Sequence, residues 1–208
     1  MIPLETLGAF FAASLILALA PGPDNIFVLT QSALQGRLAG FLVTLGLCTG
    51  LLVHTSAVTL GVAAIFQASE LAFSALKYIG AAYLLYLAWY AFRASASKIH
   101  GGKKEQLSRM QLYRRGIIMN VTNPKVSVFF LAFLPQFTNP GRGSLSLQLI
   151  LLGFLFIIAT LLVFGGVAFT AGSLGEWLSG SPRAQKIMNR IAGMVFVALA
   201  IKLATIAH

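Results

Sequence analysis

The sequence predicts an all-α integral membrane protein whose six transmembrane helices form two inverted three-helix repeats, with helices 1 and 4 interrupted at proline-containing breaks. Three observations predict this fold. Of the 208 residues, 58% are hydrophobic and 10% are charged, and the mean hydropathy is +0.85, whereas soluble domains carry about 25% charged residues. Long apolar segments recur along the chain, and two of them contain prolines beside an ionisable residue. So much apolar surface requires lipid as the solvent.

Five apolar segments are each long enough to cross a bilayer, which takes about 20 helical residues. They cover residues 38–66, 71–92, 113–135, 146–171 and 186–206. The N-terminal region is a sixth candidate. As one unbroken helix from residue 4 to 34 it would measure about 45 Å, too long for a straight span, while its apolar part before Pro21 is too short. One crossing interrupted at residues 21–25 reconciles the two lengths.

Two other interpretations of the apolar segments are weaker. The triplet Ala18-Leu19-Ala20 resembles a signal-peptidase site, but Pro21 would follow the cut, and the region before it carries Glu5 and no Lys or Arg. A signal peptide begins with positive charge. A five-span arrangement would require one apolar segment to lie along the membrane and would place one terminus inside the cell.

The basic residues indicate the topology. The connection 93–115 carries seven Lys and Arg residues, so the positive-inside rule makes it cytoplasmic. Alternation then places Arg37 and the basic residues of 183–190 on the same side, and both termini outside. We predict a single transmembrane domain over residues 1–208, made of repeat 1 at about 1–95, a cytoplasmic linker at about 96–112, and repeat 2 at about 113–208.

The net charge of +10 does not indicate a nucleic-acid-binding protein. The basic residues lie mostly in short connections between apolar segments, without the interleaved aromatics of a nucleic-acid groove. They suit anionic lipid headgroups. No Walker-type or GxGxxG loop and no His/Cys cluster with metal-ligand spacing occurs. We therefore expect no enzyme activity, no cofactor and no bound metal.

The two halves of the chain contain similar segments. The third span, "LKYIGAAYLLYLA" (76–88), aligns with the sixth, "NRIAGMVFVALAI" (189–201). The first, "APGPDNIFVL" (20–29), aligns with the fourth, "TNPKVSVFFL" (122–131). Because the two halves have opposite predicted topology, the proline breaks fall at corresponding places of an inverted repeat. Paired broken helices in inverted repeats are typical of secondary transporters, with the substrate site near the membrane midplane.

The prolines at the breaks release backbone groups from the helix. Proline lacks an N–H, so Pro21 and Pro23 leave the carbonyls of Leu17 and Leu19 without a helical donor, and Pro124 does the same to Asn120. A new helix can start after each break, with Asn123 or Gly22 as the N-cap and a proline at the first helical position. The positive ends of these helices would favour an anion.

Asp24 and Lys125 are ionisable residues within spans, where each costs about 2.5–3.5 kcal/mol to insert. Counted from Gly116, Lys125 lies about 13 Å into the membrane, close to the midplane. The functional hypothesis is a site for a zwitterion: Lys125 and the helix N-termini bind a carboxylate, and Asp24 binds an ammonium or carries a proton. The alternative is that the two groups neutralise one another or that Asp24 only stabilises a helix start.

Two features of the second span complete the candidate set. His54, near its centre, could relay protons or could be a buried hydrogen-bonding residue that holds helices together. Gly46 and Gly50 form a Gly-xxx-Gly pair, which permits close helix contact; we interpret it as packing within the bundle.

The assembled motifs resemble the LysE/RhtB family of amino-acid exporters. The resemblance rests on "ALAPGPDNIFVLTQSALQGRLAGF", "KYIGAAYLLYLAWYAFR" and "GIIMNVTNPKVSVFFLAFLPQF", in this order along nearly the whole chain. It implies export of amino acids or close derivatives from the bacterial cytoplasm, driven by the proton motive force. The substrate-binding candidates are Pro21, Gly22, Pro23, Asp24, Asn25, Asn120, Asn123, Pro124 and Lys125. Asp24 and His54 are the candidates for proton coupling.

The resemblance also implies a multi-pass protein of the bacterial inner membrane whose partners are a small amino acid, protons and the lipid bilayer, without nucleic acid. The sequence leaves the oligomeric state and the exported compound open. The alternatives are an exporter of another small solute or a metal ion, and a non-transporting membrane structural protein. A thiol-disulfide electron carrier would need a cysteine pair, and Cys48 is the only cysteine.

Overall fold

The computed structural model describes residues 2–20, 22–68, 70–94 and 106–205, and every regular element in these ranges is a helix. The first half contains α1 (Leu4–Leu19), α2 (Pro23–Gln35), α3 (Arg37–Ala68) and α4 (Glu70–Arg93). The second half contains α5 (Arg109–Val121), α6 (Pro124–Val128), the π-helical turn η1 (Phe129–Phe133), the 3₁₀ turns η2 (Leu134–Phe137) and η3 (Pro140–Arg142), α7 (Leu145–Gly180) and α8 (Pro182–Thr205). The central part of the predicted linker, residues 95–105, lies outside the described residues.

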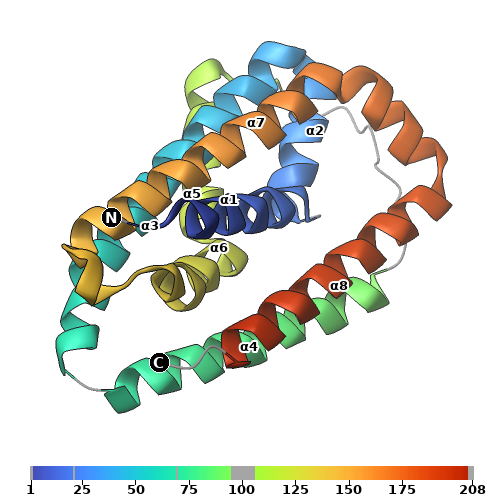
Figure 1. Ribbon diagram of the computed structural model, residues 1–208. Coiled ribbons are helices and arrows are strands. Elements are labelled where there is room, and N and C mark those ends of the chain that lie inside the picture. The colour runs from blue at the N-terminus through green and yellow to red at the C-terminus, as the bar shows by residue number, and fades with distance from the viewer. Residues whose placement is uncertain (1, 21, 69, 95–105, 206–208) are drawn as a thin grey trace.

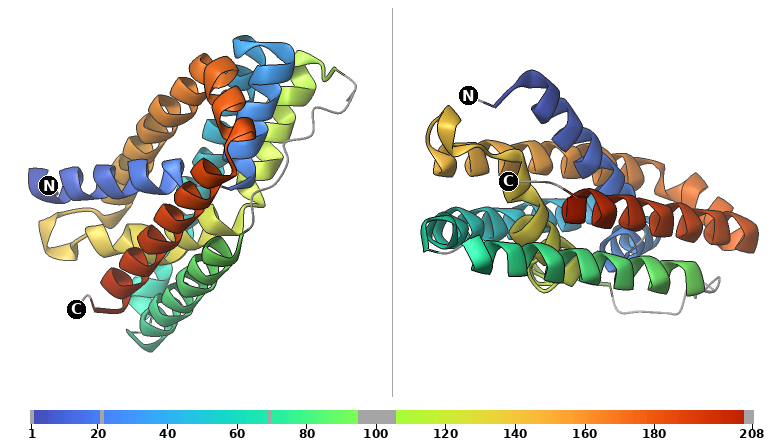
Figure 2. Two further views of the ribbon diagram at one scale, coloured as in Figure 1. Left: turned by 90° about the vertical axis from the view of Figure 1, so that its right-hand side faces the viewer. Right: turned by 60° about the horizontal axis from the view of Figure 1, so that its bottom comes forward.

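The helices pack as two antiparallel pairs with shorter elements between them (Figure 1). α3 lies against α7, and α4 lies against α8. α1 and the segment from α6 to η2 lie between the two pairs, where α1 contacts α7 and α8 and η1 contacts α4. The views in Figure 2 show the same arrangement from two further directions. Each pair therefore joins one helix of the first half to one helix of the second.

The chain alternates between two ends of the molecule, which we name by what lies there. The termini end holds the start of α1, the α3–α4 junction, residues 138–144 and the end of α8 (Figure 1). The basic end holds the α2–α3 and α7–α8 junctions, the end of α4 and the start of α5, with Arg37, Arg93, Arg109 and Arg183. Both ends of the described chain therefore lie on the same side.

Among the described residues, three helical stretches are individually long and apolar enough to cross a membrane: Arg37–Gly61, Leu145–Thr170 and Gln185–Thr205. The bent pairs α1–α2 and α5 to η2 raise the number to five when each is one span. α4 is the remaining segment of the predicted six. It is not among the stretches found in the described residues, so its crossing of the membrane stays a prediction; it packs along α8.

Most predicted boundaries agree with the helices to within a few residues, but α7 runs to Gly180, nine residues past the predicted end at 171, and the start of α5 differs for an identifiable reason. α5 begins at Arg109, four residues before the predicted start of repeat 2 at 113. Ser108 explains this, because its side chain accepts from the Gln111 backbone N–H while the Gln111 side chain accepts from the Ser108 backbone N–H. Such a capping box satisfies two orphan donors and allows a polar first turn to be helical.

Candidate functional site

Both predicted breaks are present. The axis bends by 61° between α1 and α2, and by 49° between α5 and α6. Gly22 is the N-cap of α2, with Pro23 at its first position, and Asn123 is the N-cap of α6, with Pro124 after it. Both N-caps were predicted from sequence. Pro21 lies outside the described residues.

The end of α1 is held by side chains that follow the breaks. The Lys125 ammonium donates to the carbonyl oxygens of Leu17, at 3.3 Å, and of Ala20, at 3.1 Å. The Asn25 amide donates to the Ala18 carbonyl at 2.8 Å. Leu17 is the residue whose carbonyl Pro21 deprives of its helical donor. A cation at the C-terminal end of a helix also stabilises the negative end of the helix dipole. Lys125 thus joins the second half of the chain to the broken end of α1.

A second connection joins the two breaks directly. The Asn123 Nδ2 group donates to Asp24 Oδ2 at 2.8 Å, and Asn123 Oδ1 accepts from the Lys125 backbone N–H at 3.0 Å. Asp24, Asn123 and Lys125 are 3%, 6% and 7% exposed. The Asp24 carboxylate and the Lys125 ammonium are therefore both buried at the breaks. The carboxylate accepts from the Asn123 amide, and the ammonium donates to backbone carbonyls of α1.

His54 reaches the second break from α3. Its Nε2 lies 3.1 Å from the Asn120 carbonyl oxygen, which can only accept, so Nε2 carries the hydrogen. Asn120 is the residue whose carbonyl Pro124 releases from the helix. The other face of the imidazole lies against Phe130, with ring centroids 5.5 Å apart. This contact is the one that the hydrogen-bonding interpretation of His54 requires. The proton-relay interpretation stays a prediction.

α3 and α5 approach closely because glycines line their contact. A Cβ added at Gly46 would overlap the Tyr113 carbonyl oxygen, and a Cβ at Gly116 would overlap the Val43 carbonyl oxygen. A Cβ at Gly50 would lie 2.7 Å from the Asn120 side chain. The Gly-xxx-Gly pair of α3 therefore packs within the bundle, against the helix that leads into the second break.

Several buried acceptors at the breaks have no hydrogen-bond donor. They are Asp24 Oδ1, Asn25 Oδ1 and Asn120 Oδ1; the same is true, elsewhere in the described chain, of Thr59, Gln136 and Thr160 side-chain oxygens. A buried polar atom without a partner is costly. All three atoms at the breaks are oxygens, so a hydrogen-bond donor or a cation would satisfy them.

The structure buries, fully or in part, most of the predicted site residues that it describes, and leaves two of them exposed. Asp24, Asn120, Asn123 and Lys125 are buried, Gly22 and Asn25 are partly buried, and Pro23 and Pro124 are exposed. A Cβ on Gly22 would lie 3.3 Å from Lys125 Nζ, so glycine leaves room for the ammonium. The exposed prolines shape the backbone without lining the buried group.

Two partners of the site were not identified from sequence. The carbonyl of Ala18 accepts from Asn25, and that of Ala20 accepts from Lys125. A proline marks a carbonyl that loses its helical donor, but these two carbonyls carry no such signal in the sequence. Gly50 contacts Asn120, and its spacing from Gly46 was the available signal. In the described part of the chain no three His, Cys, Asp or Glu residues lie close enough together to hold a metal ion.

Comparisons with known proteins agree with the resemblance carried by the motifs. The profile of the LysE type translocator family matches residues 15–206. A homoserine/homoserine lactone efflux protein of Salmonella typhimurium is 36% identical over 201 residues, which cover 96% of each chain. A leucine efflux protein of Enterobacter sp. (strain 638) is 31% identical, over 96% of this chain and 92% of that one.

An uncharacterized membrane protein of Vibrio cholerae is 32% identical over 95% of both chains. No solved structure gives a significant match. The matches thus cover nearly the whole length of this chain and of its relatives.

Proposed function

The chain belongs to the LysE type translocator family, and we propose that it is a secondary transporter that exports a small amino acid with an uncharged side chain from the bacterial cytoplasm. The matched relatives are named for the efflux of homoserine, homoserine lactone and leucine. None of these compounds has a charged side chain. Each carries a primary amino group, whereas the lactone has no free carboxylate, so the ammonium is the charged group that they share.

The observation that carries this proposal is the set of unpartnered acceptors at the breaks. Asp24 Oδ1, Asn25 Oδ1 and Asn120 Oδ1 are buried oxygens without donors, and a primary ammonium supplies three N–H donors and a positive charge. In the proposed complex the substrate ammonium binds these oxygens. The substrate carboxylate, where present, accepts the third N–H of the Lys125 ammonium, whose other two go to carbonyls of α1. It also accepts backbone N–H groups at the start of α2, which the cap residue Gly22 leaves without a side-chain acceptor.

The charges of the site favour a neutral side chain on the substrate. Asp24 and Lys125 are the ionisable pair buried at the breaks, and the ammonium and carboxylate of the substrate match them one to one. A further charge on the substrate side chain would be buried without a counter-charge, which is costly. Lysine and glutamate are therefore predicted to be poor substrates.

The proposed transport cycle uses the two halves of the chain as inverted repeats of three spans each, α4 included. The antiparallel α3–α7 and α4–α8 pairs support this symmetry. A two-fold axis that relates the halves would exchange α3 with α7 and α4 with α8, so the two helices of each pair would be symmetry mates. The basic end faces the cytoplasm by the positive-inside rule, so both termini face outward. The resemblance to bacterial exporters supports a location in the inner membrane. Rocking of one half against the other exposes the breaks alternately to each side.

Proton coupling in this proposal runs through Asp24, with His54 as the second candidate. Protonation of Asp24 from outside would compete with the substrate ammonium and reset the site. Moving one net charge across 100 mV is worth about 2.3 kcal/mol, so the number of protons per substrate sets the accumulation that export can oppose.

Uptake into inverted membrane vesicles tests the proposal. Labelled homoserine, homoserine lactone, leucine, lysine and glutamate are offered with and without a proton gradient. We expect gradient-dependent uptake of the first three, lost in Asp24→Asn. Glu5→Gln is the matched control, because Glu5 is an exposed carboxylate in the first turn of α1, and should transport normally. Normal uptake by Asp24→Asn would remove Asp24 from the site, and no uptake of any amino acid by the wild type would refute the proposed function.

A further inference from the structure

The buried apolar side chains form two separate clusters, one on each side of the breaks. The smaller cluster, toward the basic end, includes Val28, Val43 and Leu47; Phe164 is its one buried phenylalanine among the described residues, and Phe27 packs against it. The larger cluster extends toward the termini end. Within it lies a group that we call the phenylalanine cluster, formed by Phe10, Phe129, Phe130, Phe133, Phe137 and Phe156. The two sides of the breaks are therefore sealed by different kinds of packing.

The phenylalanine cluster occupies the space between the breaks and the termini end. Phe10 lies on α1, which runs from the termini end to the first break, and η1 and η2 run from the second break back to the termini end. Phe10 contacts Phe129 and Phe137 with ring centroids 5.9 and 5.1 Å apart. Since Phe10 is the member from the first half of the chain, these two contacts join the halves.

The rings form a continuous series from the second break to the surface. Phe130 lies 5.5 Å from the ring of His54, which binds the Asn120 carbonyl. Phe129 contacts Phe133 at 4.9 Å, and Phe133 contacts Phe137 at 5.1 Å. Phe129 and Phe133 are fully buried, and Phe137 is 8% exposed. The series is therefore apolar and buried as far as Phe137.

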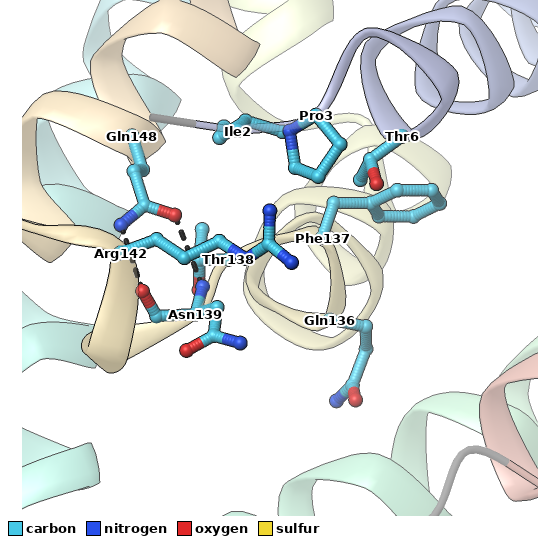
Figure 3. Close-up of a pocket in the computed structure, with 9 residues that line it drawn as sticks. All are labelled: Ile2, Pro3, Thr6, Gln136, Phe137, Thr138, Asn139, Arg142 and Gln148. Atoms are coloured by element: carbon cyan, nitrogen blue, oxygen red, sulfur yellow. Dashed lines mark hydrogen bonds between the residues drawn. The ribbon is translucent and has the colours of Figure 1, made fainter.

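Phe137 forms one wall of a cavity at the termini end, with a volume of about 220 Å³. Figure 3 shows the Arg142 side chain extending across it, beside Pro3 and Phe137. The Gln148 side chain fixes the opposite wall, because it bonds to the backbone of Asn139 in both directions. The cavity is large enough for several water molecules, each of which takes about 30 Å³. This cavity reaches the outer edge of the phenylalanine cluster at Phe137.

The backbone that carries the cluster is not α-helical. Phe129–Phe133 form a π-helical turn, closed by the Leu134 N–H donating to the Phe129 carbonyl, and a 3₁₀ turn follows. Such turns occur mostly singly and often at functional sites. A change of this segment by one residue of helical register would rotate the following rings by about 100°. A small change of backbone hydrogen bonding can therefore move Phe133 and Phe137 away from Phe10.

We propose that the phenylalanine cluster is the gate on the termini side of the substrate site, closed in this structure, and that Phe10 with Phe129 and Phe137 forms its closing contact. The inference rests on the proposed exporter, because a gate has a use only if substrate passes from the breaks to the cavity. Opening separates Phe10 from η1 and η2 and joins the two spaces. The packing of the basic end, centred on Val43 and Phe164, belongs to the opposite side.

The accessibility of a cysteine at the breaks tests this gate. Cys48 is the only cysteine, so Cys48→Ser gives a thiol-free background. Ser127→Cys then places a reporter just after Lys125, at a partly buried position whose hydroxyl bonds to the Asn123 carbonyl at 3.1 Å. A membrane-impermeant thiol reagent is added to the outside of right-side-out vesicles, and the rate of labelling is measured. The assay needs no substrate, so its result is independent of whether an amino acid is exported.

We expect Phe10→Ala and Phe137→Ala to raise the labelling rate by about tenfold or more, because weakening the closed state increases the open population. Phe137 is at the rim of the cluster, so its variant remains informative if Phe10→Ala fails to fold. Phe164→Ala is the matched control: Phe164 is 4% exposed but belongs to the other cluster, and its variant should be labelled at the parental rate. Labelling rates that are equal in Phe137→Ala and the parent, or raised equally by Phe164→Ala, would overturn the proposal.

Discussion

Replacement of Gly116 by alanine tests how closely the site depends on the α3–α5 contact. A Cβ at Gly116 would overlap the Val43 carbonyl oxygen and would lie 3.0 Å from the Gly46 Cα and 3.1 Å from the Leu47 nitrogen. All three neighbours are backbone atoms, so no rotation of a side chain can relieve the overlap. The two helices must move apart to admit one methyl group.

The size of the effect follows from two opposing terms. Alanine is favoured over glycine within a helix by about 1 kcal/mol. Overpacking a well-packed interface costs about 1–3 kcal/mol, and an overlap with backbone belongs at the upper end of this range. We therefore expect Gly116→Ala to lower the free energy of unfolding by about 1–2 kcal/mol. The same interface carries the 3.1 Å contact between His54 and Asn120, so separation of the helices should also reduce transport.

The measurement is thermal unfolding in detergent, paired with vesicle uptake of homoserine. Gly165→Ala is the control, because a Cβ on Gly165 has no neighbouring atom within 4 Å. It should gain stability by up to about 1 kcal/mol from helix propensity alone and should transport normally. If Gly116→Ala were as stable as Gly165→Ala and fully active, the close α3–α5 contact would not support the site, and the reasoning would be refuted.

Three further predictions follow from individual contacts. Lys125→Met should lower the free energy of unfolding by about 2–4 kcal/mol, seen as a lower midpoint of thermal unfolding. The Leu17 carbonyl loses a charge-assisted hydrogen bond, and Asp24 loses the neighbouring positive charge. Unchanged stability would show that this bond is not required. His54→Gln retains an N–H donor for the Asn120 carbonyl, so it should transport where His54→Phe does not; equal loss in both variants would favour the proton-relay interpretation. Ser108→Ala removes the cap of α5 and should cost about 1 kcal/mol, measured by the same unfolding assay, with transport unaffected.

Much of the fold could be predicted from the sequence because membrane segments are defined by length and composition. The apolar stretches, the position of both breaks, and the N-caps at Gly22 and Asn123 all depend on local chemistry. α4 (Glu70–Arg93) also forms a helix over the predicted segment 71–92, and its role as a membrane span stays a prediction.

The sequence predicted which residues belong to the candidate site, but it did not predict their hydrogen-bond partners. Sequence chemistry identified Asp24 and Lys125 as a charged pair within spans, and left open whether they neutralise each other. In the structure Lys125 binds the carbonyls of Leu17 and Ala20, and Asp24 binds Asn123. Two buried charges can be stabilised by many partners, and the spacing of residues along a helix does not choose among them.

The sequence by itself determined that this chain lies in lipid, where its apolar segments are broken, and which carbonyls its prolines release. Each of these depends on residues that are neighbours along the chain or on the thickness of the bilayer. Only the tertiary structure decided what those carbonyls bind: Lys125 reaches Leu17 across 108 residues and His54 reaches Asn120 across 66. The physical reason is that these contacts join segments far apart along the chain, which leave no periodicity in the sequence; the His54–Asn120 contact also depends on glycines that let α3 and α5 approach closely.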